Sequence, residues 1–133
     1  MFFNINPSNG VPVYEQIARQ IIFAIASGGI DSGEMVPSVR ALSKELAVNP
    51  NTVSRAYRQL QDSQVLETVR GEGLIVTRNA VTKCQKTRQQ LVADRIFSAI
   101  EEAHQSQLTV PEIKTLVDKA LATSKTKTEK RKR

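Results

Sequence analysis

The strongest constraint on the fold is a helix start at Asn49-Pro50. An asparagine side chain can accept from the free amides of a first helical turn, and proline fits the first helical position because no donor is required there. Apolar residues then follow at positions 53, 56, 57 and 60, the spacing of one buried helix face. The pattern predicts an amphipathic helix whose opposite face is polar and carries Asn51, Thr52, Ser54, Arg55 and Arg58.

Two further helices are predicted upstream. Apolar residues recur at helical spacing from Val13 to about Ser27, after which Gly28-Gly29 ends the helix. Ser38 is placed to cap a short helix that runs through Ala47. This second helix directly precedes the one that begins at Pro50, which is the order of a helix-turn-helix.

Two β-type runs follow, Val65 to Val69 and Leu74 to Thr77. They are joined by Arg70-Gly71-Glu72-Gly73, in which the glycines supply the backbone freedom of a tight hairpin. Three helices and a hairpin predict a winged helix-turn-helix over residues 1–79, so the expected fold class is mainly α with a small β-hairpin.

The pattern changes beyond Asn79 to two helices, Thr82 to about Gln105 and Val110 to about Ala122. Because two helices bury little by themselves, the predicted hairpin over residues 80–123 is expected to pair with a second copy of the chain. The residues predicted to form this dimer contact are Leu91, Val92, Ile96, Ile100, Ile113, Leu116, Val117 and Leu121. Residues 124–133 are expected to form a disordered basic tail.

The formal net charge is +6, but its distribution is uneven. Acidic and basic side chains balance over residues 1–80, so the entire excess lies in residues 81–133 and mostly in the tail. Residues 38–60 nevertheless carry four basic side chains, Arg40, Lys44, Arg55 and Arg58, against Glu45 alone, a local net charge of +3. This local excess is better evidence for a nucleic-acid partner than the total charge.

A helix fits the major groove of B-form DNA, and its N-terminal residues can reach the base edges. In that geometry Asn51 is suited to adenine and Arg55 to guanine, while Thr52 or Ser54 can contact bases or phosphate. Lys44 and Arg58 are assigned to phosphates, and Arg70 to the backbone or the adjacent minor groove. Each of these side chains taken alone is also typical of a solvated protein surface.

Several classes of function are not indicated. The longest apolar stretch, at residues 21–26, is far shorter than a membrane span, and no signal peptide is recognisable, so a cytoplasmic protein is expected. One cysteine and one histidine offer no metal site, and no residue set suggests a cofactor or catalysis. Cys84 is expected to be an inert thiol, with a disulfide between two copies as the alternative.

Ordered motifs extend over residues 8 to about 78, namely Pro-Val-Tyr-Glu-Gln-Ile at 12–17, Pro-Ser-Val-Arg-Ala-Leu at 37–42, Asn-Pro-Asn-Thr-Val-Ser-Arg-Ala-Tyr at 49–57 and Gly-Glu-Gly at 71–73. In these motifs the chain strongly resembles GntR-family regulators, and its short C-terminal part resembles the YtrA-like subfamily. The resemblance implies operator contacts by the Pro-Ser-x-Arg motif and the third helix, with a wing at Gly71 to Gly73. The implied residues are Arg40, Asn49, Asn51, Thr52, Ser54 and Arg55, and Ser38 beside Arg40 is also predicted to contact DNA.

The resemblance also implies dimerisation through the C-terminal helices and repression, often of a neighbouring transporter operon. It indicates no particular small-molecule effector, and RNA polymerase would be affected only indirectly. Two positions depart from the family pattern: Gln64 stands where glycine is common before the first wing strand, and Val36 stands where leucine is usual.

The predicted function is a homodimeric repressor that binds a pseudo-palindromic operator in double-stranded DNA. The alternative is a protein-interaction adaptor, in which the winged domain binds no specific DNA and the helical hairpin docks a different partner. Steep salt dependence of duplex binding separates the two, because an adaptor releases no counterions from DNA.

Overall fold

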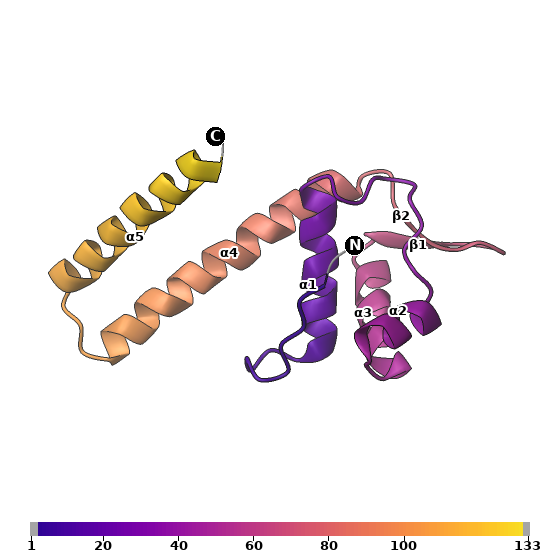
Figure 1. The fold of residues 1–133 in the computed structure, drawn as a ribbon, viewed down its shortest axis with the longest axis horizontal. Helices are drawn as coiled ribbons and strands as arrows, with labels where there is room; N and C mark the ends of the chain where they lie inside the picture. The colour runs from indigo at the N-terminus through magenta and orange to yellow at the C-terminus, as the bar shows by residue number, and fades with distance from the viewer. Residues whose placement is uncertain (1–2, 132–133) are drawn as a thin grey trace. The chain divides into compact units, whose positions relative to one another are not determined.

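The computed structural model describes residues 3–131, with side chains described up to residue 125. Its elements are α1 (Val13–Ala26), α2 (Val39–Leu46), α3 (Pro50–Asp62), β1 (Leu66–Val69), β2 (Gly73–Val76), α4 (Ala80–Gln105) and α5 (Val110–Arg131) (Figure 1). The chain divides into two compact units between Leu91 and Val92, within α4. We call them the winged unit and the C-terminal unit. The predicted fold class, mainly helical with one small hairpin, is confirmed.

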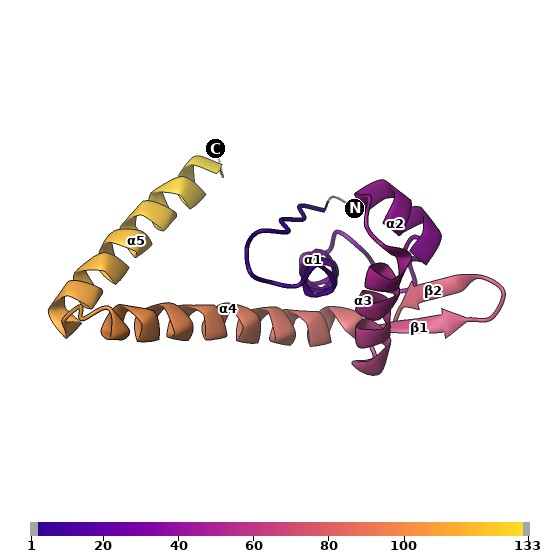
Figure 2. The same cartoon turned by 90° about the horizontal axis from the view of Figure 1, so that it is seen from below.

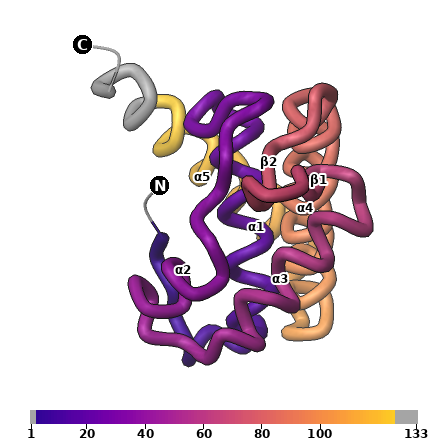
Figure 3. The backbone as a smooth tube through the Cα atoms, turned by 90° about the vertical axis from the view of Figure 1, so that its right-hand side faces the viewer, coloured from indigo at the N-terminus to yellow at the C-terminus, as the bar shows by residue number. Residues whose placement is uncertain are grey.

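Both predicted helix caps are present. Ser38 Oγ accepts from the backbone N–H of Ala41 at 3.0 Å, and Asn49 Oδ1 accepts from that of Asn51 at 2.8 Å. Ala47 at the end of α2 adopts a left-handed conformation with φ 54°. The chain then turns from α2 into α3 (Figure 3). The helix-turn-helix is therefore built from two side-chain caps and one left-handed turn residue.

One hydrophobic core fills the winged unit. The apolar face of α1 lies along α3, so that the two helices form its centre (Figure 1). The predicted stripe of α3 is buried as expected. The fully buried members include Ile17, Ile21, Ile25, Leu42, Val53, Leu60, Leu66, Val76 and Cys84. Because α3 is held by this stripe along one side, its opposite side is fixed in place for contact with a partner.

The hairpin pairs β1 and β2 antiparallel, with Leu66 opposite Val76 and Val69 opposite Gly73. Figure 2 shows its turn extending away from α1–α3. Residues 33–36 run beside β2, because Gly33 N donates to Val76 O at 2.8 Å and Val36 N to Leu74 O at 3.0 Å. Met35 also forms a bridge with Ile75. This third extended segment, which the sequence did not predict, attaches the wing to the start of α2.

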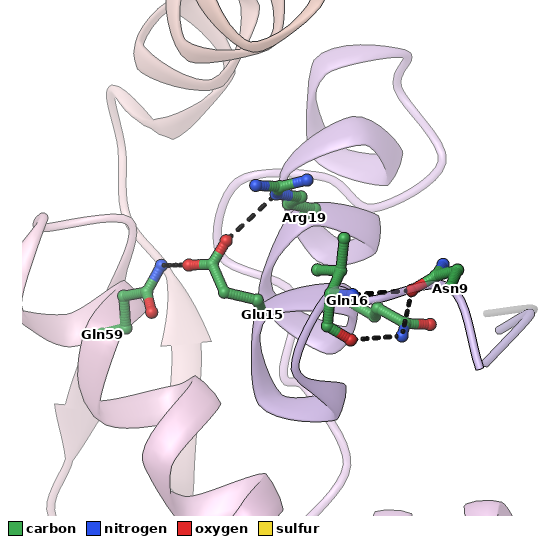
Figure 4. Close-up of polar contacts among 6 residues, drawn as sticks. Asn9, Glu15, Gln16, Arg19 and Gln59 are labelled. Carbon is green, nitrogen blue, oxygen red and sulfur yellow. Dashed lines mark hydrogen bonds and ion pairs between the residues drawn. The ribbon is translucent and has the colours of Figure 1, made fainter. Parts of the chain in front are cut away.

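The segment before α1 is held by two glutamines one helical turn apart. Gln20 donates to the carbonyl of Asn4 and accepts from its N–H. The buried Gln16 bonds in the same two-way manner to Asn6, and its amide also donates to Asn9 Oδ1 at 3.1 Å and Val11 O at 2.8 Å (Figure 4). These bonds satisfy backbone groups that no helix or strand pairs, so the segment is fixed to α1.

The first turns of α4 belong to the winged unit. Ala80 and Cys84 are buried in its core, and Gln85 Nε2 donates to Ala26 O at 3.3 Å. A boundary was expected after residue 79, whereas the two units divide after Leu91. The reason is that apolar side chains at the start of α4 complete the core of the winged unit.

The C-terminal unit contains the rest of α4, and α5. The predicted capping box is formed, since Thr109 Oγ1 lies 2.8 Å from Glu112 Oε1 and the Thr109 N–H donates to the same oxygen at 3.1 Å. These bonds lower the pKa of Glu112. The helix α5 runs to Arg131, beyond the end predicted near Ala122 and into the segment expected to be disordered, of which residues 132–133 lie outside the described part of the chain. No glycine or proline interrupts residues 124–131, so nothing in the sequence forces the helix to stop.

Most apolar side chains of the C-terminal unit face solvent. Of the predicted dimer residues in this unit, Ile113 is buried and Ile100 half-buried. The exposed ones are Val92, Ile96, Leu116, Val117 and Leu121. Phe97, which is not among the predicted dimer residues, is 70% exposed. No described helix is long and apolar enough to cross a membrane.

Candidate nucleic-acid interface

The outer face of α3 carries the polar side chains predicted to read DNA. Asn51, Arg55 and Arg58 are exposed and recur at four- and three-residue steps, so they form one continuous line along the helix. Thr52 and Ser54 flank this line and are half-buried. Two guanidinium groups and one amide thus present hydrogen-bond donors and one acceptor on a single helix face, the groups that recognise base edges and phosphates.

The two capping residues have part of their bonding capacity already in use. Asn49 Oδ1 holds the Asn51 N–H, and Ser38 Oγ holds the Ala41 N–H. The groups left over are donors, namely the Nδ2 amino group of Asn49 and the hydroxyl hydrogen of Ser38, and donors suit phosphate oxygens better than the mixed pattern of a base edge. Both side chains are exposed.

The helix before α3, α2, also carries basic side chains. Arg40 and Lys44 are one helical turn apart and both are exposed. The start of α2 is fixed to α3, because the hydroxyl of Tyr57 donates to the carbonyl of Pro37 at 2.7 Å. Burial raises the pKa of Tyr57, and the nearby Glu45 raises it further. The phenol therefore remains a neutral donor and keeps the two helices in register.

The wing tip is open on the surface. Arg70 is exposed, and Gly71 and Gly73 have φ values of 81° and 123°, where a side chain is strained. A Cβ built at either glycine meets no atom within 4 Å. The glycines therefore serve the backbone of the turn, and the same lack of side chains leaves the tip able to approach a flat or charged surface closely.

The sequence is similar to those of known bacterial regulatory proteins. The family described as bacterial regulatory proteins, gntR family, matches residues 13–76, from the start of α1 to the end of β2. The HTH-type transcriptional repressor YtrA of Bacillus subtilis is 35% identical over 100 residues, which are 75% of this chain and 77% of that protein. The chain belongs to the gntR family of bacterial regulatory proteins.

Solved structures of transcriptional regulators resemble more of this chain than the winged unit. A transcriptional regulator from Oenococcus oeni has a TM-score of 0.67 at 28% identity, and the likeness covers 90% of this chain and 99% of that one. YtrA from Sulfolobus acidocaldarius, a GntR-family transcription factor, has a TM-score of 0.56 at 26% identity, covering 91% and 97%. The C-terminal helices of this GntR protein are therefore part of the shared fold.

The departure at Gln64 has a visible consequence in this GntR chain. Gln64 has φ 63°, the left-handed conformation that glycine adopts without strain. Its carbonyl accepts from Thr77 Oγ1 at 2.8 Å and from Lys83 Nζ at 3.4 Å. The turn into the wing therefore forms although a glutamine stands in place of glycine. The left-handed backbone of this glutamine destabilises the folded protein by roughly 1 kcal/mol relative to glycine.

Two residues of α1 that were not predicted to belong to the site, Tyr14 and Glu15, contact α3. The guanidinium carbon of Arg55 lies 3.8 Å from the centre of the Tyr14 ring. Glu15 accepts from Gln59 Nε2 at 3.0 Å and pairs with Arg19 at the same distance (Figure 4). The motif at residues 12–17 contained both side chains, but periodicity along one helix does not reveal which residues of another helix they meet.

Cys84 is fully buried, and burial raises the pKa of its thiol from 9.0 to about 11, against a smaller lowering by Lys83. Burial agrees with the expectation of an inert thiol and disfavours a disulfide between copies. Among the described residues no three potential ligands gather into a metal site.

A raised thiol pKa predicts pH-dependent stability. The pKa of the Cys84 thiol is higher in the folded state than in the unfolded state. The contribution of the protonated thiol to the free energy of unfolding is therefore complete below about pH 9 and is lost as pH rises toward 11. Raising the pH from 7 to 10.5 should lower the free energy of unfolding of the unaltered protein. This decrease should exceed that of the Cys84→Ala variant by roughly 1–2 kcal/mol. Urea titrations of both proteins measure this, and parallel pH profiles would contradict it.

Proposed function

We propose that this protein is a homodimeric transcriptional repressor that binds a pseudo-palindromic operator in double-stranded DNA. The observation that carries the proposal is the exposed line of Asn51, Arg55 and Arg58 on α3, within a GntR-family winged unit. Such a face fits the major groove, where an asparagine can pair with adenine and an arginine with guanine. The similarity to a named repressor supports the direction of regulation.

Phosphate contacts would set the orientation of the helix. Lys44 and Arg58 are assigned this role, together with the donors of Ser38, Arg40 and Asn49, all of them exposed. Thr52 and Ser54 can contact either a base or a phosphate from their half-buried positions. The wing, through Arg70 and the glycine tip, would contact the backbone or the neighbouring minor groove.

Dimerisation would pair two reading helices for two half-sites. The exposed apolar side chains of α4 and α5 support it, because a lone chain rarely leaves so many large apolar groups on one pair of helices in water. A two-fold operator then requires half-sites about 10 bp apart, or a multiple of that spacing. No catalytic step is proposed. Repression would take place in the cytoplasm, and RNA polymerase would be affected only indirectly, through the occupied operator.

Selection of bound fragments from random duplex DNA tests this function. We expect an enriched inverted repeat whose half-site spacing follows the helical turn. If the full-length protein enriched no duplex, or if its duplex binding were independent of salt, the proposal would fail and an adaptor would be favoured.

Lys44→Ala is expected to weaken binding to the selected operator and to unrelated duplex by a similar factor. The logarithmic salt slope should fall by about one, because one phosphate contact and its released counterion are lost. Fluorescence anisotropy at several salt concentrations measures both. A loss confined to the selected sequence would show instead that Lys44 reads bases.

A further inference from the structure

The contact between Tyr14 and Arg55 joins a fixed ring to a side chain that is otherwise free in solvent. Tyr14 is half-buried and packs against the core, whereas Arg55 is exposed on the outer line of α3. The guanidinium carbon lies 3.8 Å from the ring centre, within the range of a cation–π contact. The long arginine side chain therefore has one ordered resting place.

A second contact holds the same two helices one turn further along. Glu15 follows Tyr14 in α1, and Gln59 lies four residues after Arg55 in α3. Gln59 donates to Glu15 at 3.0 Å, and Arg19 holds the other carboxylate oxygen at 3.0 Å (Figure 4). The first turn of α1 thus meets α3 at two successive turns, so the Tyr14 ring has a defined place beside the reading face.

Stacking leaves the hydrogen-bonding capacity of Arg55 intact. The five N–H donors of a guanidinium lie in its plane, so a ring that covers one face does not occupy them. A stacked arginine can therefore donate two parallel hydrogen bonds from its edge. It also loses less rotamer freedom on binding than an arginine that is disordered beforehand.

We propose that Tyr14 is a positioning residue for DNA recognition, whose ring holds the Arg55 guanidinium in a reading orientation before and during operator binding. This inference rests on the proposed function, in which Arg55 contacts a base. It adds a residue of α1 to a reading surface that otherwise consists of α2, α3 and the wing.

The first test uses the free protein. The ¹⁵Nε–H group of Arg55, assigned by its loss in Arg55→Lys, reports the order of the side chain. We expect Tyr14→Phe, which keeps the ring, to preserve its order parameter, and Tyr14→Leu to lower it. Tyr14→Met is a second variant without a ring, should the leucine disturb the core. An order parameter unchanged in both ring-free variants would overturn the proposal.

The second test is a double-mutant cycle with the selected operator. Tyr14→Leu is expected to weaken binding about two- to fivefold and Tyr14→Phe less than about twofold, as for one exposed cation–π contact. In an Arg55→Ala background, Tyr14→Leu should cause no further loss. An equal loss in both backgrounds would overturn the positioning role while leaving the function intact. If Arg55→Ala itself left affinity unchanged, both the role of Tyr14 and the assignment of Arg55 to a base would fail.

Discussion

Replacing Leu116 and Leu121 together by glutamate is expected to yield monomers that bind the full operator about 10²–10⁴-fold more weakly than the unaltered protein. Both side chains are more than half exposed in the single chain, at 53% and 63%, so neither supports the core of the winged unit. Burying two carboxylates in an apolar contact between copies would be strongly unfavourable. Without the partner, the second half-site no longer benefits from a tethered reading helix.

Light scattering on a size-exclusion column measures the assembly, and a gel-shift titration measures the affinity. Thr115→Glu with Ala122→Glu is the matched control, because it adds the same charge at exposed positions on the opposite side of α5. The control should remain dimeric. A monomeric unaltered protein at micromolar concentration would refute the dimer, and full operator affinity in the glutamate variant would show that dimerisation does not contribute to binding.

Arg55→Ala is expected to cost roughly 1–3 kcal/mol of specific operator binding, about 5- to 150-fold, and to relax the preference at one base position of each half-site. The reason is that a lost bidentate contact removes both affinity and discrimination at the base it reads. The winged unit should remain folded, because Arg55 is exposed and the buried stripe of α3 is untouched.

The measurement is a set of anisotropy titrations against the selected operator and versions altered at each half-site position. Lys44→Ala is the comparison, because it removes one positive charge from α2 without removing a predicted base contact. If the Arg55 and Lys44 variants lost affinity in the same sequence-independent way, Arg55 would be a phosphate contact. If Arg55→Ala bound the selected operator with unchanged affinity, Arg55 would not contact a base, and the assignment of α3 as the reading helix would lose its main support.

Much of the winged unit follows from local patterns. The caps at Ser38 and Asn49, and the glycines of the hairpin, act within a few residues of their own position, so the sequence predicts the elements that they start or turn. Periodicity likewise identified the buried stripe of α3. The family motifs then connected these elements to a known order.

The missed contacts join residues far apart in the chain. Glu15 and Gln59 are separated by 44 positions, and the bridge from Met35 to Ile75 also joins distant segments. Neither leaves a periodic signal. The extension of α5 was missed for another reason: a lysine- and threonine-rich end has the composition of a disordered tail, although its residues also form helix.

The extended segment at residues 33–36 affects how the protein behaves when concentrated. An exposed hairpin has two edges that can pair with strands of other molecules and so start aggregation. Here residues 33–36 already occupy the β2 edge through the bonds to Leu74 and Val76, and β1 carries the exposed charge of Glu67. The wing can therefore project into solvent with its β2 edge already paired, which disfavours the joining of copies through their β-strands.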